Sequence, residues 1–265
     1  MTERRLEGSP IVYYISGTKR DEWAVFLHAA FADHTMFDSQ AEYFKDKYNV
    51  LTLDLIGHGK SVEAKKGDNI AMTADWIKGI FDKEGIAKAH IVGISLGAVI
   101  AQNFADKYPQ VISSLACFGG YDINNFDPKL QKENSSHQTG IMFKAVFSVK
   151  WFASANKKIC AYTEKAQEEF YNINIRFPKK SFMYLAGLGR LVGRSTGTPR
   201  CCPLMIGCGR HDIPSELEII NLWKKREPNC ETVIFEGAGH CVNMDVPEEF
   251  NRVIERFWGK SKKSL

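Results

Sequence analysis

A serine between two glycines, Gly93-Ile94-Ser95-Leu96-Gly97, is the feature that most constrains the fold of this 265-residue chain. An apolar run precedes the pentapeptide and a run with helical periodicity follows it, so the sequence predicts a strand, a sharp turn and a helix. Glycine at both outer positions removes the side chains that would clash in such a turn. The turn places Ser95 at a helix N-terminus, where free N–H groups favour negative charge, and this suits a serine nucleophile.

Short apolar runs alternate with helix-like stretches along most of the chain, which predicts a mostly parallel sheet with helices on both faces. Runs that are apolar throughout, such as Val25-Phe26-Leu27, are typical of strands buried on both faces. The expected strands are residues 11–15, 24–29, 50–55, 90–94, 112–118, 204–208 and 232–236. The expected helices are residues 36–48, one around Met72 to Phe81 that ends before Gly85, one from Ser95 that ends before Pro109, and one that begins at Pro247.

The alternation of strands and helices breaks between residues 121 and 200, a segment that is helix-like and has no convincing strand. It predicts a helical cap of residues 121–200 inserted into a core of residues 1–120 and 201–265. Glycines at 187–189 and 193–197 indicate the loop that returns to the sheet. The aromatic residues of the segment, most of them expected to pack within the cap, are Phe126, Phe143, Phe147, Trp151, Phe152, Tyr162, Phe170, Tyr171, Phe177, Phe182 and Tyr184. Its lysine pairs, at 157–158 and 179–180, indicate a solvated face more than a site for an anionic substrate.

Composition and charge exclude several classes of protein. A formal charge of +4 is too small to indicate a nucleic-acid partner, and no apolar stretch reaches membrane-spanning length. The seven cysteines are odd in number and irregularly spaced, which predicts neither a disulfide framework nor a zinc site and favours a reducing cytosol. The first residues have no signal-peptide pattern. We therefore expect a cytoplasmic protein that acts on a small molecule without nucleic acid or stable membrane insertion, as a monomer or a homodimer.

A base and an acid that could serve Ser95 follow it in the sequence. His240 lies in the loop Gly237-Ala238-Gly239-His240 after the last expected strand, where it can act as general base and then as general acid. Asp212 ends the loop after strand 204–208 and can orient the imidazole, although an Asx turn or a helix cap is the alternative reading. Weaker candidates for the acid are Glu216, Glu236 and Asp245.

An oxyanion site requires two N–H groups. We assign one to Leu96, the residue after the serine, and the other to Ala30, with Phe31 as the alternate. An ordinary strand-to-helix connection remains the alternative for the segment around Ala30. His58, in a glycine-containing loop after strand 50–55, is expected to pin that loop.

Together these motifs resemble those of the α/β-hydrolase superfamily, and the resemblance spans nearly the whole chain. The residues that carry it are 28–30, 54–61, 93–97, 207–212 and 237–240. The resemblance implies a mostly parallel eight-stranded sheet with a helical cap after the sixth strand and a triad of Ser95, Asp212 and His240. His28-Ala29 departs from the His-Gly that many members have at the oxyanion loop.

The resemblance also limits the reaction. Haloalkane dehalogenases and epoxide hydrolases of this fold use aspartate at the position of Ser95, so they are set aside. The chain is similar to small-molecule carboxylesterases and enol-lactonases, which implies hydrolysis of a small ester or lactone through an acyl-enzyme, with no metal or organic cofactor. The alternatives are carbon–carbon bond hydrolysis or perhydrolysis on the same triad, and a ligand-binding sensor with weak turnover.

Overall fold

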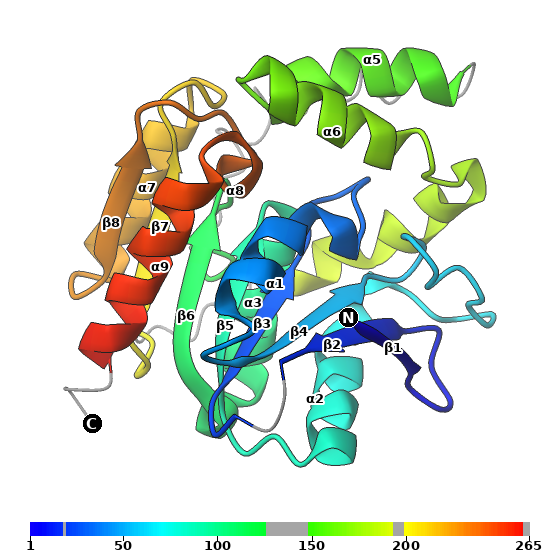
Figure 1. The fold of residues 1–265 in the computed structure, drawn as a ribbon, viewed down its shortest axis with the longest axis horizontal. Coiled ribbons are helices and arrows are strands. Elements are labelled where there is room, and N and C mark those ends of the chain that lie inside the picture. Colours follow the sequence, from blue (N-terminus) through cyan, green and yellow to red (C-terminus); the bar gives the residue numbers. More distant parts are fainter. Residues whose placement is uncertain (18–19, 126–147, 193–198, 262–265) are drawn as a thin grey trace.

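The computed structural model describes residues 1–17, 20–125, 148–192 and 199–261. They form an eight-stranded sheet with the order β1-β2-β4-β3-β5-β6-β7-β8 (Figure 1). The first two pairings, β1 with β2 and β2 with β4, are antiparallel, and all the others are parallel. The strands are β1 (Thr2–Arg5), β2 (Val12–Ser16), β3 (Trp23–Leu27), β4 (Asn49–Asp54), β5 (Ala89–Ile94), β6 (Ile112–Phe118), β7 (Leu204–Gly209) and β8 (Glu231–Phe235).

All seven strands that the sequence predicts are present, with bounds that differ by two residues or fewer. The central ones are apolar on both faces because helices cover both faces; every residue of β4, β5 and β7 is buried. The edge strand β1 was not predicted. Its sequence, Thr-Glu-Arg-Arg, is exposed along its whole length, so only backbone pairing with β2 makes it a strand.

The helices follow the sequence closely, with one correction. Helix α2 ends at Gly85, which adopts φ 68° in the left-handed region, as a C-terminal glycine does. The predicted helix 36–48 is wrong in extent, because a 3₁₀ turn precedes a shorter α1 that ends at Phe44. The helical elements are η1 (His34–Phe37), α1 (Asp38–Phe44), η2 (Ile70–Met72), α2 (Thr73–Glu84), α3 (Leu96–Lys107), η3 (Pro109–Val111), α5 (Val149–Cys160), α6 (Glu164–Asn174), η4 (Lys179–Leu191), α7 (Glu216–Arg226), α8 (Val242–Asp245) and α9 (Pro247–Ser261).

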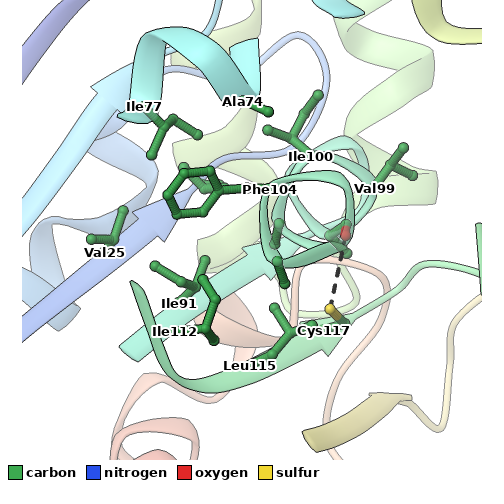
Figure 2. Packing of buried hydrophobic residues seen from close by; sticks show 14 of the residues in the cluster. Val25, Ala74, Ile77, Ile91, Val99, Ile100, Phe104, Ile112, Leu115 and Cys117 are labelled. Atoms are coloured by element: carbon green, nitrogen blue, oxygen red, sulfur yellow. Dashed lines mark hydrogen bonds between the residues drawn. The ribbon is translucent and has the colours of Figure 1, made fainter. Parts of the chain in front are cut away.

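Two apolar clusters, one on each face of the sheet, hold the helices in place. Helices α1 and α9 cover one face, and α2, α3 and α7 cover the other (Figure 1). Figure 2 shows the second cluster, in which Phe104 of α3 and Ile77 of α2 pack over Ile91 of β5. There the Cys117 thiol points at the Ala98 carbonyl oxygen across 3.8 Å. Helix α3, which begins directly after Ser95, is therefore fixed along its length by the core.

The break in alternation corresponds to helices between the sixth and seventh strands. Helices α5, α6 and η4 lie there, and the described residues of 121–200 contain no strand. Figure 1 shows α5 and α6 beyond the carboxyl end of β6, which is the arrowhead of that strand. The predictions for Phe126, Phe143, Phe147 and the glycines at 193–197 lie outside the described residues. The expected mostly parallel eight-stranded sheet with helices on both faces is confirmed, and the division at residues 120 and 200 stays a prediction.

The length and hydropathy of a helix decide whether it can cross a membrane. Across the part of the chain that the structure describes, no helix combines the length and the hydropathy needed to cross a bilayer.

Candidate active site

Ser95 occupies a strained turn between β5 and α3. Its φ of 55° and ψ of −116° lie where a residue with a side chain is rarely found. A Cβ at Gly93 would lie 2.3 Å from the Gly97 carbonyl oxygen, and one at Gly97 would lie 1.9 Å from the Leu27 carbonyl oxygen. Both glycines are therefore required for the turn, for the reason that the sequence indicated.

Asp212 and His240 are brought together by two loops that leave neighbouring strands. The backbone N–H of His211, after β7, donates to the carbonyl of Ala238, after β8, across 2.9 Å. The Nδ1 of His240 then lies 2.9 and 3.1 Å from the two carboxylate oxygens of Asp212. The carboxylate is 1% exposed and the imidazole 16% exposed. The structure thus pairs the predicted base with the predicted acid.

The electrostatics of this pair fix the tautomer of the imidazole. Burial by itself lowers the pKa of His240, but the neighbouring Asp212 carboxylate outweighs burial and raises it. Because Nδ1 donates its proton to Asp212, Nε2 is the nitrogen left to accept a proton. This is the state that a general base requires.

The segment after β6 borders both Ser95 and His240. The N–H of Ser95 donates to the carbonyl of Phe118 across 2.8 Å, which places the turn beside the end of β6. The next residue, Gly119, has φ 58°, and a Cβ there would lie 3.0 Å from Cε1 of the His240 ring. The serine turn and the histidine loop therefore meet at the same short stretch of backbone.

The predicted oxyanion donors have backbone N–H groups available. Among the described residues, neither Leu96 nor Ala30 donates its N–H to a hydrogen bond. His28 shapes the loop that carries Ala30: its Nε2 accepts from the Leu55 N–H across 2.9 Å, so its Nδ1 donates to the Ala29 carbonyl across 2.7 Å. Burial lowers the pKa of His28, which keeps this link neutral.

Comparison with known proteins agrees with the fold. A protein-family profile described as "alpha/beta hydrolase fold" matches residues 24–135. The chain is 24% identical to a hydrolase of Pseudomonas sp., named 2-hydroxy-6-oxononadienedioate/2-hydroxy-6-oxononatrienedioate hydrolase, over 97% of this chain and 94% of that protein. It is 22% identical to an uncharacterized carboxylesterase, nap, of Bacillus subtilis, over 88% of this chain and 78% of that one. The structure of a thermophilic esterase from Thermogutta terrifontis superposes with a TM-score of 0.78 at 20% identity, covering 98% of both chains.

The chain has the α/β-hydrolase fold. The similar proteins include hydrolases and carboxylesterases, and hydrolysis is the activity that these similarities support.

The weaker acid candidates occupy different places in this α/β hydrolase. Glu236 is at the surface, paired with Arg210 across 2.8 Å. Asp245 is buried but bonds backbone N–H groups, among them that of Gly239 across 2.8 Å. Glu216 is buried beside the Asp212–His240 pair; one nitrogen or oxygen atom of each of these three side chains lies within 4.8 Å of the other two.

Phenylalanines of the segment between β6 and β7 surround the loop that carries Ala30. Phe31 has a φ of 65°, and its ring makes edge contacts with Phe152 of α5 and Phe177, with centroids 4.9 and 5.1 Å apart. Phe182 lies against the same ring at 5.5 Å. The Phe31 carbonyl also accepts from the Asn174 side chain across 3.3 Å. Part of the aromatic content of the cap therefore packs on the candidate oxyanion loop rather than only within the cap.

His58 and the lysine pairs behave as expected where they are described. Nδ1 of His58 bonds the Ile56 carbonyl across 3.0 Å, and burial followed by the proximity of His28 lowers the pKa of His58 to about 3. It therefore stays neutral and holds its loop. Lys157 pairs with Glu168 across 3.0 Å on the cap surface.

The sequence did not reveal the links between the cap and the histidine loop. Asp245 accepts from the N–H groups of Tyr162 and Thr163, across 3.0 and 2.7 Å, at the start of α6. Tyr162 stacks on His211 with ring centroids 3.7 Å apart, and the Cys241 N–H donates to the Cys160 carbonyl across 2.7 Å. These partners are about 50 to 80 residues apart in the chain, and neither periodicity nor motif spacing reports such contacts.

Proposed function

We propose that this hydrolase cleaves a small carboxylic ester or lactone, with Ser95 as nucleophile, His240 as general base and Asp212 as the acid that orients the imidazole. The observation that carries the proposal is the His240–Asp212 hydrogen bond of 2.9 Å, on loops that meet beside the strained turn of Ser95. A nucleophile, a base and an orienting acid on three strand ends are the parts that acyl transfer requires.

The proposed reaction proceeds in two halves. His240 Nε2 accepts the hydroxyl proton as Ser95 Oγ attacks the carbonyl carbon, and the oxyanion is stabilised by the N–H groups of Leu96 and Ala30. The imidazolium, stabilised by the Asp212 carboxylate, donates its proton to the leaving alcohol as the carbon–oxygen bond breaks. Water then attacks the acyl-enzyme by the same proton path and releases the acid. In this scheme residues 121–200 act as a cap over the site.

Charge pairing near the site favours an uncharged ester over an acidic substrate. Arg176 is paired with Asp33, after β3, and Arg210 of the Asp212 loop is paired with Glu236, each across 2.8 Å. Their charges are thus already compensated by protein carboxylates. The similarity to a carboxylesterase and to an esterase points in the same direction.

A second candidate is hydrolysis of a 2-hydroxy-6-oxo dienoic acid by the same residues. The similarity to the Pseudomonas hydrolase favours it, since the two proteins match over 97% of this chain. A substrate of that type brings carboxylate groups, so it would require a cation that the two paired arginines do not supply.

Ester hydrolysis can be tested with p-nitrophenyl esters of increasing acyl length. We expect Ser95→Ala to lower kcat/KM by about a thousandfold or more, because the nucleophile is lost. The matched control is Ser39→Ala, at an exposed position of α1, which should leave activity unchanged. Labelling with a fluorophosphonate and mapping of the modified residue identifies the nucleophile directly. Full esterase activity in Ser95→Ala, or label on another residue, would refute the assignment.

A further inference from the structure

Glu216, the first residue of α7, is a buried carboxyl group whose place in the reaction scheme is unassigned. It is 4% exposed, and within the described ranges its Oε2 atom has no hydrogen-bond partner. It lies within the 4.8 Å cluster that includes Asp212 and His240. A buried, unpartnered carboxyl oxygen is costly for stability, so its position beside an acid–base pair requires an explanation.

The surroundings of Glu216 favour its protonated form. Burial raises its pKa most, the Asp212 carboxylate raises it further, and the opposing effect of His240 leaves it at about 8. The charge of Glu216 also raises the pKa of the Cys208 thiol, at the end of β7, and the charge of Cys160 of α5 raises the pKa of His240. Glu216 is therefore an uncharged acid at neutral pH and a carboxylate in mildly alkaline solution.

The charge on Glu216 acts on His240 in turn. A carboxylate within about 5 Å of an imidazole stabilises the imidazolium, so ionised Glu216 raises the pKa of His240. The two groups therefore titrate as a pair, and one proton can reside on either of them.

We propose that Glu216 is a positioning residue that competes with His240 for a proton and so sets the pH at which the imidazole becomes a free base. This inference rests on the proposed function, in which His240 is the general base. Below the pH at which Glu216 ionises, Asp212 is the carboxylate of this cluster that stabilises the protonated imidazole. Above that pH, the ionised carboxylate of Glu216 stabilises the proton on Nε2 of His240. His240 then becomes a free base only when the Glu216–His240 pair loses its second proton.

The test is the pH profile of kcat/KM for p-nitrophenyl acetate in the wild type, Glu216→Gln and Glu218→Gln. Glu218 provides the matched control because it lies two residues further along α7 and is exposed. Glutamine keeps the shape of Glu216 but cannot ionise. We expect all three curves to coincide below about pH 8, and Glu216→Gln to exceed the other two by up to about tenfold above it. A role in packing alone would lower activity equally at every pH and would not move the profile.

A second measurement keeps the inference testable if Glu216→Gln does not fold. The Cε1 proton of His240, followed by NMR in the wild type, should titrate in two steps, one of them near pH 8. A single step, or superimposable pH profiles of the wild type and Glu216→Gln, would overturn the inference. If Ser95→Ala is inactive, a negative result for Glu216 leaves the proposed function intact. If Ser95→Ala is active, the proposed function is refuted, but the NMR titration still tests the role of Glu216.

Discussion

At the scale of single residues, Ser95 is held in a conformation that costs folding free energy. Its φ of 55° is tolerated because the strand, the helix and the two glycines around it leave the chain no alternative. A side chain in the left-handed region costs about 1 kcal/mol, a cost that glycine avoids.

We therefore predict that Ser95→Gly is more stable than Ser95→Ala by about 1 kcal/mol, because glycine relieves the strain and alanine retains it. Both variants lack the hydroxyl, so both should be inactive. Urea unfolding of the two variants measures the difference. Equal free energies of unfolding would show that the backbone at Ser95 is not strained in solution.

At the scale of elements, Asp245 connects the start of α6 with the loop that carries His240. Its carboxylate accepts from Tyr162, Thr163 and Gly239, at distances from 2.7 to 3.0 Å, and it is 8% exposed. Gly239 directly precedes His240, so the same carboxylate that holds the cap also holds the candidate base.

Asp245→Ala should lower the free energy of unfolding by about 2 to 4 kcal/mol, because it leaves several buried N–H groups without an acceptor. It should also lower kcat, since the histidine loop loses its anchor. Thermal unfolding and ester hydrolysis below the melting temperature measure the two effects separately. Glu248→Ala, an exposed change three residues further along, is the control and should alter neither. Loss of stability with unchanged kcat would show that Asp245 holds only the cap.

The elements that the sequence predicts correctly are those whose apolar pattern repeats locally. β3 to β7 were predicted because their apolar runs reflect burial on both faces, and α2 because its apolar residues and Gly85 mark its face and its end. β1 was missed because an exposed strand of Thr-Glu-Arg-Arg carries no apolar signal. Asp245 was considered only as a possible acid, because two of its partners, Tyr162 and Thr163, lie more than 80 residues earlier in the chain.

The candidate site shows the same limit. Ser95, Asp212 and His240 could be selected because each follows a strand and their order fits a known arrangement. The position of Glu216 could not be interpreted, since burial and charge, which raise its pKa, depend on the fold. It lies four positions after Asp212 in the sequence, but only the structure places it beside His240.

At the scale of the whole molecule, a buried group of charges joins the end of the cap segment to the core. Arg200 pairs with Asp106 at the end of α3 across 2.8 Å and with Glu227 after α7 across 3.2 Å. Arg226 bonds both Asp122 and Glu227. Arg200 is 6% exposed, and Asp122 and Glu227 are 3% and 4% exposed. Each of the three carboxylates in this group thus bonds at least one of the two arginines.

Arg200→Met should destabilise the protein by about 3 to 5 kcal/mol, because it leaves buried carboxylates without their cation. The control is Lys60→Met, which removes an exposed lysine paired with Glu3 and should have no measurable effect. Chemical denaturation measures both, and kcat/KM at low temperature should be unchanged in both. An Arg200→Met protein as stable as the control would show that the buried carboxylates do not need Arg200.

The carboxylate of Asp245 also determines what an engineer could exchange. It binds the start of α6 and the residue before His240 with the same two oxygens, so these two segments are fitted to one carboxylate. A chimera that receives a foreign cap between β6 and β7 would fit the sheet but leave Asp245 facing the wrong backbone. We therefore expect a chimera to keep this contact only if the segment between β6 and β7 is exchanged together with residues 239–245.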